Sequence, residues 1–313
     1  MVAEYVSLGH PDKMADVITE FLLDYCEKKQ NGVRYGVEVL LKDNTIIFAG
    51  ESSYKPNNEE LLTITKDALR FIGYDEQYHS VWRENAIDIT RLEIINLIGE
   101  QSPEIAKGLQ NGWGDQGVFI GYAGDNLAYN TTKKINNDLY TLARKEMGRY
   151  GLDIKTIVTT ENNKIKEVVA AIPTKYPEEI FEKLQKEYPE AKIIVNGTGS
   201  YIRHSTIADS GVTGRKLAVD FYGGFYGIGG GCPWGKDYSK ADLTLNLYAK
   251  KIAEEINSYT NKNTKVVLSC AIGQPEILHQ IYLDGELYKE YITNEHPSVV
   301  IDRIKKPYIC LLK

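Results

Sequence analysis

The chain has 313 residues, of which 42% are hydrophobic and 26% charged, the balance of an ordinary globular protein large enough for two or three domains. Its net charge of −6 gives no global positive field, which argues against nucleic acid or an anionic membrane as a partner. There is no apolar run of about 18 residues and no apolar leader, and the four widely spaced cysteines form no C-x-x-C pair, so we expect a cytoplasmic protein without a zinc site or a disulfide framework.

The N-terminal segment contains a clear helix signal. Pro11 suits the first turn of a helix, and an apolar face continues from there to about Lys28. His10 and Asp12 therefore lie at the helix N-terminus, where the partial positive charge favours anions. The two side chains could hold a phosphate and a metal there, although helix capping is the commoner use of such residues.

A hairpin is predicted after this helix. Residues 33–41 alternate between apolar and polar side chains, and residues 45–49 form a second strand after a turn-like segment. Glu38 lies within the first strand and Glu51 follows the second. Glutamates in strands usually face solvent, so these two residues alone indicate no function.

The middle of the chain continues to alternate between helices and strands. Helices are predicted at 58–72, 130–150 and 177–188, and strands at 86–90, 93–98, 155–160, 166–172 and 192–195. The glycine-rich stretch 111–122 indicates a tight backbone. Strand pairs and helices thus recur about three times, which suggests related α+β units.

The C-terminal third combines glycine, charge and further elements. Arg215 and Lys216 precede a short apolar segment predicted as a strand, and Asp209 occupies a turn before them. An adjacent Arg-Lys pair is usually surface charge. The remaining predicted elements are strands at 217–219, 266–272, 277–282 and 308–312 and a helix at 296–305.

The stretch at residues 229–242, GGGCPWGKDYSKAD, is the most unusual part of the chain. Its three leading glycines let backbone N–H groups approach a ligand, and Lys236 and Lys240 follow at the start of a helix predicted over 239–259. Such an arrangement suits a polyphosphate, and Asp242 could hold the accompanying Mg²⁺. The alternative is a glycine turn before an ordinary solvated helix, because the stretch does not fit the Walker pattern.

Four segments taken together resemble the S-adenosylmethionine synthetase (methionine adenosyltransferase) family. They are GHPDK at 9–13, GWGDQG at 112–117, DSGVTGRKLAVDFYGG at 209–224 and GGGCPWGKDYSKAD at 229–242. IGEQSP at 98–103 and AIGQPE at 271–276 add support. The similarity extends in one order from about residue 4 to about residue 276, and chance agreement of four such motifs is implausible.

The resemblance implies an α+β fold of three similar α/β domains with mixed sheets around a pseudo-threefold axis. We expect domains at 1–104, 111–202 and 208–313, with strands that interleave between them and a third domain that is trimmed. The resemblance also implies a homodimer whose active sites contain residues of both subunits. Larger family members pair such dimers into tetramers, whereas the trimmed tail here favours a dimer.

The implied reaction joins ATP and L-methionine. The methionine sulfur attacks the 5′ carbon of ATP, the whole triphosphate leaves, and the bound tripolyphosphate is hydrolysed to phosphate and pyrophosphate. Such a highly charged leaving group requires positive charge around it in the transition state. Mg²⁺, with two ions expected, and K⁺ are the implied cofactors.

The family's functional residues can be carried over at the matching positions. The implied catalytic residues are His10, Lys155, Arg215, Lys216, Lys236 and Lys240. The implied ATP-binding residues are His10, Asp115, Asp153, Lys155, Tyr201, Asp209, Arg215, Lys216 and Lys236. The implied methionine-binding residues are Glu51, Gln101, Asp209 and Lys240. The implied metal ligands are Asp12 and Asp242 for Mg²⁺ and Glu38 for K⁺.

The sequence departs from the family pattern at several uncharged positions. Ser200 stands where an arginine is usual, Ile228 where a histidine is usual, and Trp113 where an alanine is usual. A catalytically silent relative that binds ATP or polyphosphate and regulates a partner is therefore the alternative. The presence of every charged site residue that can be matched favours the enzyme, and the missing Walker and kinase motifs disfavour an unrelated kinase.

Overall fold

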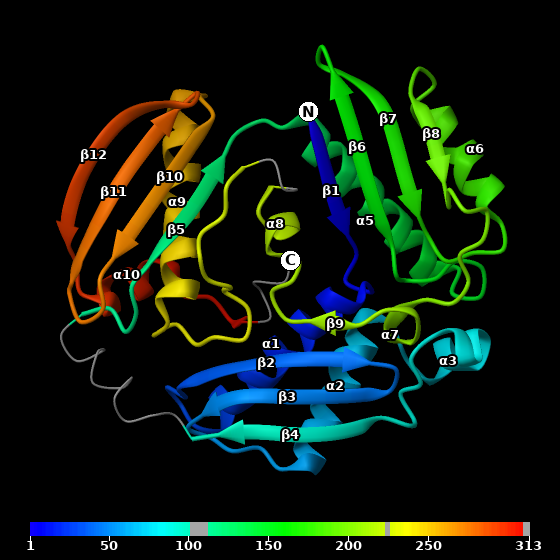
Figure 1. The fold of residues 1–313 in the computed structure, drawn as a ribbon, viewed down its shortest axis with the longest axis horizontal. Helices are drawn as coiled ribbons and strands as arrows, with labels where there is room; N and C mark the ends of the chain where they lie inside the picture. The colour runs from blue at the N-terminus through cyan, green and yellow to red at the C-terminus, as the bar shows by residue number, and fades with distance from the viewer. Residues whose placement is uncertain (101–111, 223–225, 309–313) are drawn as a thin grey trace.

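The structure is a computed structural model, and it describes residues 1–100, 112–222 and 226–308. In these residues the strands form three four-stranded sheets, each with helices on one face, grouped around a common centre (Figure 1). Two of the sheets mix parallel and antiparallel pairs, and the third is antiparallel throughout. This architecture agrees with the α+β fold that the sequence predicts.

The first sheet has the strand order β4-β3-β2-β9. Its strands are β2 (Tyr35–Lys42), β3 (Thr45–Ser52), β4 (Glu93–Gly99) and β9 (Gly211–Val212). The helices α1 (Pro11–Lys29) and α2 (Asn58–Ile72) pack on it and on each other, and α3 (Glu76–Trp82) follows α2. The predicted hairpin is confirmed, but the fourth strand comes from far along the chain.

The second sheet has the order β1-β6-β7-β8. Its strands are β1 (Val2–Val6), β6 (Lys155–Glu161), β7 (Lys164–Ala171) and β8 (Lys192–Val195), covered by the helices α5 (Leu127–Lys145) and α6 (Pro177–Glu187). Here the distant strand is β1, which the sequence analysis did not predict. It pairs antiparallel with β6 over its whole length, from Val2 opposite Thr159 to Val6 opposite Lys155.

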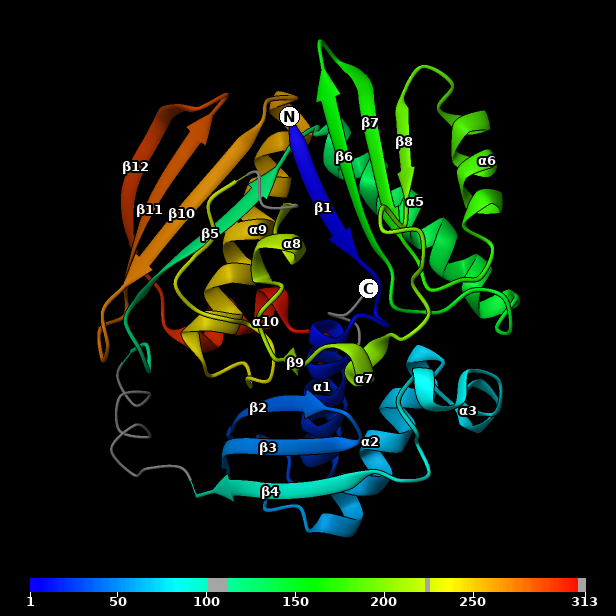
Figure 2. The same ribbon diagram turned by 45° about the vertical axis from the view of Figure 1, so that its right-hand side comes forward.

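The third sheet has the order β12-β11-β10-β5. Its strands are β5 (Gly117–Ala123), β10 (Thr264–Cys270), β11 (Glu276–Leu283) and β12 (Glu286–Asn294), and its helices are α9 (Ala241–Thr260) and α10 (Pro297–Ile304). Figures 1 and 2 both place α9 directly behind β5 and β10. Gly121 allows this approach, because an added Cβ would lie 2.1 Å from the Ala249 backbone.

Two predicted strands, 217–219 and 86–90, are not strands in the structure. Residues 217–219 form part of a short helix, α8 (Leu217–Asp220), in which the N–H groups of Val219 and Asp220 bond to the Lys216 carbonyl. A run of three apolar residues cannot distinguish a strand from a helical turn. Residues 86–90 form no strand, because their N–H groups donate to side chains such as Ser205. The glycine-rich stretch 111–122 contains β5, and the strand predicted at 308–312 lies almost wholly outside the described residues.

The helix α1 lies at the centre of the molecule and is buried on nearly all sides (Figure 2). Met14, Ile18 and Leu22 pack in the core as the apolar periodicity predicts. The polar side of the helix is buried as well, which periodicity does not predict. None of the helices within the described ranges is long and apolar enough to span a membrane.

Candidate active site

One face of α1 carries an acidic ladder, which consists of Asp12, Asp16 and Glu20. The spacing of four residues stacks the three carboxyl groups along one side of the helix, and all three residues are fully buried. Each carboxyl accepts a hydrogen bond from a distant backbone N–H group. The donors are Val212 at 3.0 Å, Gly214 at 2.8 Å and Gly235 at 2.8 Å, respectively.

The acidic ladder positions two loops at once. Val212 and Gly214 lie just before Arg215 and Lys216, whereas Gly235 lies just before Lys236. A buried carboxyl that holds a backbone N–H group fixes the loop, because losing the bond would leave a buried polar group unsatisfied. The basic residues of both predicted motifs are therefore anchored to the same helix.

The Asp12 cluster consists of His10, Asp12, Arg215 and Lys216. The Arg215 Nε lies 2.8 Å from Asp12 Oδ1, and the Lys216 Nζ lies 2.7 Å from Asp12 Oδ2. Burial alone would raise the pKa of Asp12, but the hydrogen bonds from Lys216 and the Val212 N–H outweigh it and hold the pKa below its ordinary value. Asp12 is therefore an ionised carboxylate with two cations on it.

His10 is the N-cap residue of α1, as its position before Pro11 predicts. Its Nδ1 accepts a hydrogen bond from the Asp12 N–H at 3.2 Å. Burial and the positive charges of Lys216 and Lys155 lower the pKa of His10 to about 4. The imidazole is thus neutral at physiological pH, with its proton on Nε2, where it can donate to an anion beside the cluster.

Four further predicted residues surround the Asp12 cluster. Lys155 in β6 is 41% exposed and forms an ion pair with Glu4 at 2.8 Å, and the exposed Asp209 raises the pKa of His10. Asp153 is buried, accepts from the Ser205 N–H at 2.9 Å and receives the Tyr201 hydroxyl on its carbonyl at 3.3 Å. Burial raises the pKa of Asp153 to about 6.

The second group of predicted residues forms what we call the Lys240 pocket, a hollow of about 260 Å³. The Lys236 ammonium pairs with the Asp242 carboxylate, and the Lys240 Nζ lies 3.2 Å from Glu51 Oε1. The residues that line it are Gly36, Glu51, Gly114, Asp115, Lys236, Ser239, Lys240, Ala241 and Asp242. The sequence predicts site roles for Glu51, Asp115, Lys236, Lys240 and Asp242 among them.

Glycine is required where the Lys240 pocket meets the glycine-rich loop. A Cβ on Gly231 would lie 1.8 Å from a carboxylate oxygen of Asp242, so any side chain there would displace that group. A Cβ on Gly229 would likewise lie 2.4 Å from the Val118 carbonyl oxygen, so two of the three consecutive glycines leave no room for a side chain. Lys240 is the N-cap of α9, and Asp242 lies in its first turn.

The remaining predicted residues lie outside both groups. Glu38 is exposed in β2 opposite Ala49 of β3, on the same sheet face as Gly36, but it is not among the residues that line the Lys240 pocket. Gln101 lies outside the described residues. Within a single chain, the predicted residues therefore divide into two separate groups.

The outer face of the first sheet carries exposed apolar side chains. Leu40, Ile47 and Ile95 lie in register across β2, β3 and β4, and Leu97 follows two residues after Ile95. Leu97 is 61% exposed and Ile95 is 42% exposed. Residues of the same parity share a face of a strand, so Glu51 opens on the same face as Ile47. Exposed apolar side chains therefore line up with Glu51 on one face of the first sheet.

The carboxylates of the Asp12 cluster and of the Lys240 pocket could bind a hard cation such as Mg²⁺ only together with other ligands. In the described part of the chain, no group of three or more His, Cys, Asp or Glu residues could hold a metal ion by itself. Mg²⁺ is usually held by one or two carboxylates plus phosphate oxygens and water. Asp12 and Asp242 fit that pattern, because each offers one carboxylate beside cations that a phosphate would attract.

The sequence analysis missed the deeper part of this arrangement. Asp16 and Glu20 are not among the predicted site residues, although their spacing from Asp12 is visible in the sequence as D-x-x-x-D-x-x-x-E. Lys13 lies in the GHPDK motif but has no predicted role. It forms ion pairs with Asp16 at 3.0 Å and with Asp220 at 2.8 Å, and these two charges outweigh burial and raise its pKa.

Comparisons with known proteins agree with this arrangement of motifs. The family model of the S-adenosylmethionine synthetase N-terminal domain matches residues 1–103, and that of the C-terminal domain matches residues 203–301. The S-adenosylmethionine synthase of Acholeplasma laidlawii is 31% identical over 88% of this chain and 79% of its own length. That of Helicobacter pylori strain J99 is 30% identical over 97% of this chain and 84% of its own length.

A solved structure of this family has a similar fold. An S-adenosylmethionine synthetase from Campylobacter jejuni, described as unusual, superposes with a TM-score of 0.88 at 26% identity. The match covers 100% of this chain and 92% of that chain.

Proposed function

Because the chain belongs to the S-adenosylmethionine synthetase family, we propose that it is a methionine adenosyltransferase that forms S-adenosylmethionine from ATP and L-methionine. In this reaction the methionine sulfur attacks the 5′ carbon of ATP, and the C5′–O bond to the triphosphate breaks. The bound tripolyphosphate is then hydrolysed to phosphate and pyrophosphate. Both substrates are cytoplasmic metabolites, and the proposal includes a cytoplasmic location.

The observation that carries this proposal is the set of preorganised cations. Arg215 and Lys216 rest on Asp12, and Lys236 rests on Asp242, so each cation is held in place by a carboxylate in the absence of an anion. A triphosphate would give these cations a stronger partner without moving the backbone. Such fixed charge stabilises the negative charge that develops on the leaving group.

The proposed roles of the individual residues are those that the family resemblance implies, and their surroundings support several of them. His10 is neutral and donates from Nε2 to a phosphate oxygen, while Arg215, Lys216, Lys236 and Lys155 supply positive charge. The sulfur is itself the nucleophile, so no side chain forms a covalent bond. The enzyme contributes positioning and electrostatic stabilisation.

The remaining proposed roles concern binding of the nucleoside of ATP and of the charged end of methionine. Asp115, Asp153 and Tyr201 bind the nucleoside, with the half-buried Tyr201 ring able to stack on adenine. Glu51 and Lys240 bind the charged end of methionine together with Asp209 and Gln101. The ion pair between Lys240 and Glu51 supports this role, because an amino acid carries the same two charges and can exchange partners with both.

Asp12 and Asp242 are the proposed Mg²⁺ ligands, and Glu38 is the proposed K⁺ ligand. When bound, Mg²⁺ neutralises triphosphate charge and orients its oxygens. Asp12 and Asp242 each lie beside cations that interact with the same phosphates. Glu38 lies on the exposed sheet face, so further ligands for K⁺ would come from outside this face.

We propose that two chains assemble as a homodimer with shared sites. The row of Leu40, Ile47 and Ile95, in which Leu40 and Ile95 are exposed, supports the first sheet as part of the interface, and Glu51 opens on the same face. The separation of the Asp12 cluster from the Lys240 pocket supports a site completed by a second copy. A twofold interface uses the same patch on both chains and closes, so no tetramer is required.

The direct test is incubation of the purified protein with ATP, L-methionine, Mg²⁺ and K⁺, followed by detection of the sulfonium product by mass spectrometry. We expect S-adenosylmethionine together with phosphate and pyrophosphate. Binding of ATP without any sulfonium product would identify a catalytically silent relative instead.

A further inference from the structure

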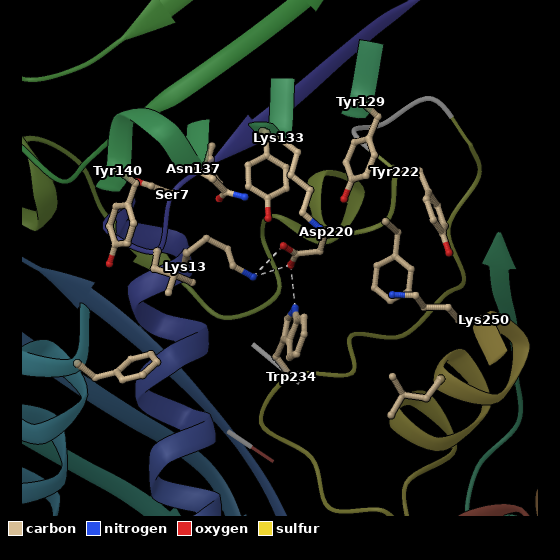
Figure 3. A pocket seen from close by; sticks show the side chains of 16 residues that line it. Ser7, Lys13, Tyr129, Lys133, Asn137, Tyr140, Asp220, Tyr222, Trp234 and Lys250 are labelled. Carbon is tan, nitrogen blue, oxygen red and sulfur yellow. Dashed lines mark hydrogen bonds and ion pairs between the residues drawn. The ribbon is translucent and has the colours of Figure 1, made fainter. Parts of the chain in front are cut away.

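A separate cavity of about 360 Å³ lies between the three sheet-and-helix units (Figure 3). Its lining shares no residue with the Asp12 cluster or the Lys240 pocket. We call it the central cavity. Its volume is in the range of pockets that hold small molecules.

The central cavity is lined by three lysines, each from a different long helix. Lys13 comes from α1, Lys133 from α5 and Lys250 from α9, and Asp220 is the single carboxylate among the lining residues. Asp220 is already engaged, because it pairs with Lys13 at 2.8 Å and accepts from the Trp234 indole at 2.9 Å (Figure 3). The lining therefore carries an excess of positive charge.

Lys133 differs from the other two lysines, because Lys13 pairs with Asp16 and Asp220, and Lys250 lies 3.8 Å from Glu254. Within the described residues Lys133 has no carboxylate at ion-pair distance, whereas its neighbour Lys134 pairs with Asp138 and Glu187. Burial and the charge of Lys250 lower the pKa of Lys133 below its ordinary value, against the weaker opposing effect of Asp220. A half-buried ammonium without a counterion is costly, and a bound anion would remove that cost.

The walls around Lys133 are aromatic. Its Nζ lies 5.8 Å from the ring centroid of Tyr5 and 5.9 Å from that of Tyr129, and these two rings meet edge to face at 6.0 Å. Burial raises the pKa of both phenols, so both stay protonated. In the described part of the chain neither hydroxyl has a hydrogen-bond partner, which leaves two donors for a ligand.

The helix α5 presents these groups together because of their spacing. Tyr129, Lys133, Asn137 and Tyr140 recur at intervals of four, four and three residues, which places them on one helix face. The opposite face, with Ile135 and Leu139, is buried against the second sheet. The face of α5 toward the cavity is therefore polar and aromatic, although packing against the second sheet does not require such side chains there.

We propose that the central cavity binds a small organic anion that carries a planar ring, such as an aryl phosphate. Its anionic group would lie between Lys133 and Lys250 and its ring against Tyr5 and Tyr129. The ammonium groups recognise the charge, and the tyrosines supply ring contact and hydroxyl donors. This site is additional to the proposed catalytic site, and binding there requires no catalysis.

The test uses phenyl phosphate, titrated calorimetrically into the full chain without Mg²⁺. We expect Lys133→Met to weaken binding about 10- to 100-fold, the usual effect of a hydrogen bond to a charged group. Lys250→Met should weaken it in the same direction. The second variant guards against misfolding of the first, because Lys250 is 48% exposed. Unchanged affinity in both variants would overturn the proposal.

Two controls assign the binding to this cavity and to this chemistry. Lys134→Met, which changes the next residue of α5, should bind phenyl phosphate as the wild type does, and Lys216→Met, in the Asp12 cluster, should keep the binding that depends on Lys133. Loss of binding in Lys216→Met alone would place the anion at the catalytic site and overturn the proposal. Inorganic phosphate and benzyl alcohol should each bind more weakly than phenyl phosphate, and equal affinity for either would overturn the requirement for both charge and ring.

Discussion

The Asp12 cluster and the Lys240 pocket both pair cations with carboxylates but differ in the burial of those carboxylates. The carboxylate of Asp12 is fully buried and bears two cations, whereas the side chains of Lys236 and Asp242 are 23% and 19% exposed. Lys240 and Glu51 are similarly open, at 18% and 26%. The first group has an excess of positive charge around one carboxylate, and the second consists of matched pairs.

This difference indicates two ways to prepare a site for a charged ligand. The Asp12 cluster keeps its cations because a buried charge cannot be left unpaired, so an anion adds to an existing arrangement. The matched pairs of the Lys240 pocket lose less on separation, because solvent already reaches them. We infer that the Asp12 cluster is the rigid side of the proposed catalytic site and that the Lys240 pocket is the adaptable side.

The largest expected effect comes from removing one cation on each side. Arg215→Ala and Lys236→Ala should each lower kcat about 10²- to 10³-fold while the protein stays folded, because each removes one preorganised electrostatic contact. Steady-state kinetics with ATP and methionine would measure this. Lys192→Ala, at an ion-paired lysine 69% exposed in β8, is the matched control and should keep wild-type turnover. Wild-type kcat in both site variants would remove these residues from the proposed mechanism.

Replacing the two proposed Mg²⁺ ligands tests whether the Asp12 cluster is the rigid side of the proposed catalytic site and the Lys240 pocket the adaptable side. Asp12→Asn and Asp242→Asn should each raise the half-saturating Mg²⁺ concentration at least about tenfold, since even indirect partners of metal ligands contribute that much. Only Asp12→Asn should also lower the thermal stability, because it leaves Arg215 and Lys216 without their buried partner. An unchanged Mg²⁺ titration would exclude the carboxylate concerned as a ligand.

Mixed dimers test whether the two sides come from different chains. His10→Ala and Glu51→Ala should each be nearly inactive alone. Random mixing should restore about a quarter of wild-type activity, because half of the dimers are mixed and each mixed dimer has one intact site. Activity after unfolding and refolding the mixture would measure this. No recovery, with mixed dimers present by native mass spectrometry, would show that both residues act within one chain.

The smallest expected effect concerns the anchor between α1 and the Lys236 loop. Burial raises the pKa of Glu20 from 4.5 to about 8, so the folded state binds a proton that the unfolded state releases. Its stabilising contribution is complete below pH 4.5 and is lost as the pH rises through 8. The Gln side chain of Glu20→Gln stays neutral at every pH. The melting temperature of this variant should therefore fall less between pH 6 and pH 9 than that of the wild type. We expect the two decreases to differ by about a few degrees, as is usual for a small stability change in a protein of this length. Glu182→Gln, exposed in α6, is the control and should follow the wild type; an identical pH dependence in Glu20→Gln would contradict the assignment.

Most helices and strands, and the candidate site residues within each motif, could be predicted from the sequence, because they depend on residues close together in the chain. The hairpin of β2 and β3 and the helices α1 and α9 follow from periodicity and turn residues. The acidic ladder could not be predicted in the same way, since Glu20 bonds to Gly235, 215 residues away. Periodicity assigns Asp16 and Glu20 to a solvent face, and only long-range packing buries that face.

The same limit applied to the sheets and to the candidate site. Each sheet takes one strand, β9, β1 or β5, from a distant segment, and local periodicity does not show which distant strand a segment pairs with. The grouping of the site residues into an Asp12 cluster and a Lys240 pocket depends on the fold of the whole chain. The order of residues in the sequence does not reveal it.

Each sheet contains a strand from a distant segment of the chain, and this affects how the protein can fold during its synthesis on the ribosome. β1 ends at Val6 but pairs with β6, which begins at Lys155, and β5 ends at Ala123 but pairs with β10, which begins at Thr264. At the usual rate of synthesis each waiting strand stays without its partner for on the order of ten seconds. The first sheet likewise lacks β9 until Val212 has been made. The nascent chain therefore cannot complete one domain before the next begins, and it exposes unpaired strand edges until the C-terminal third appears.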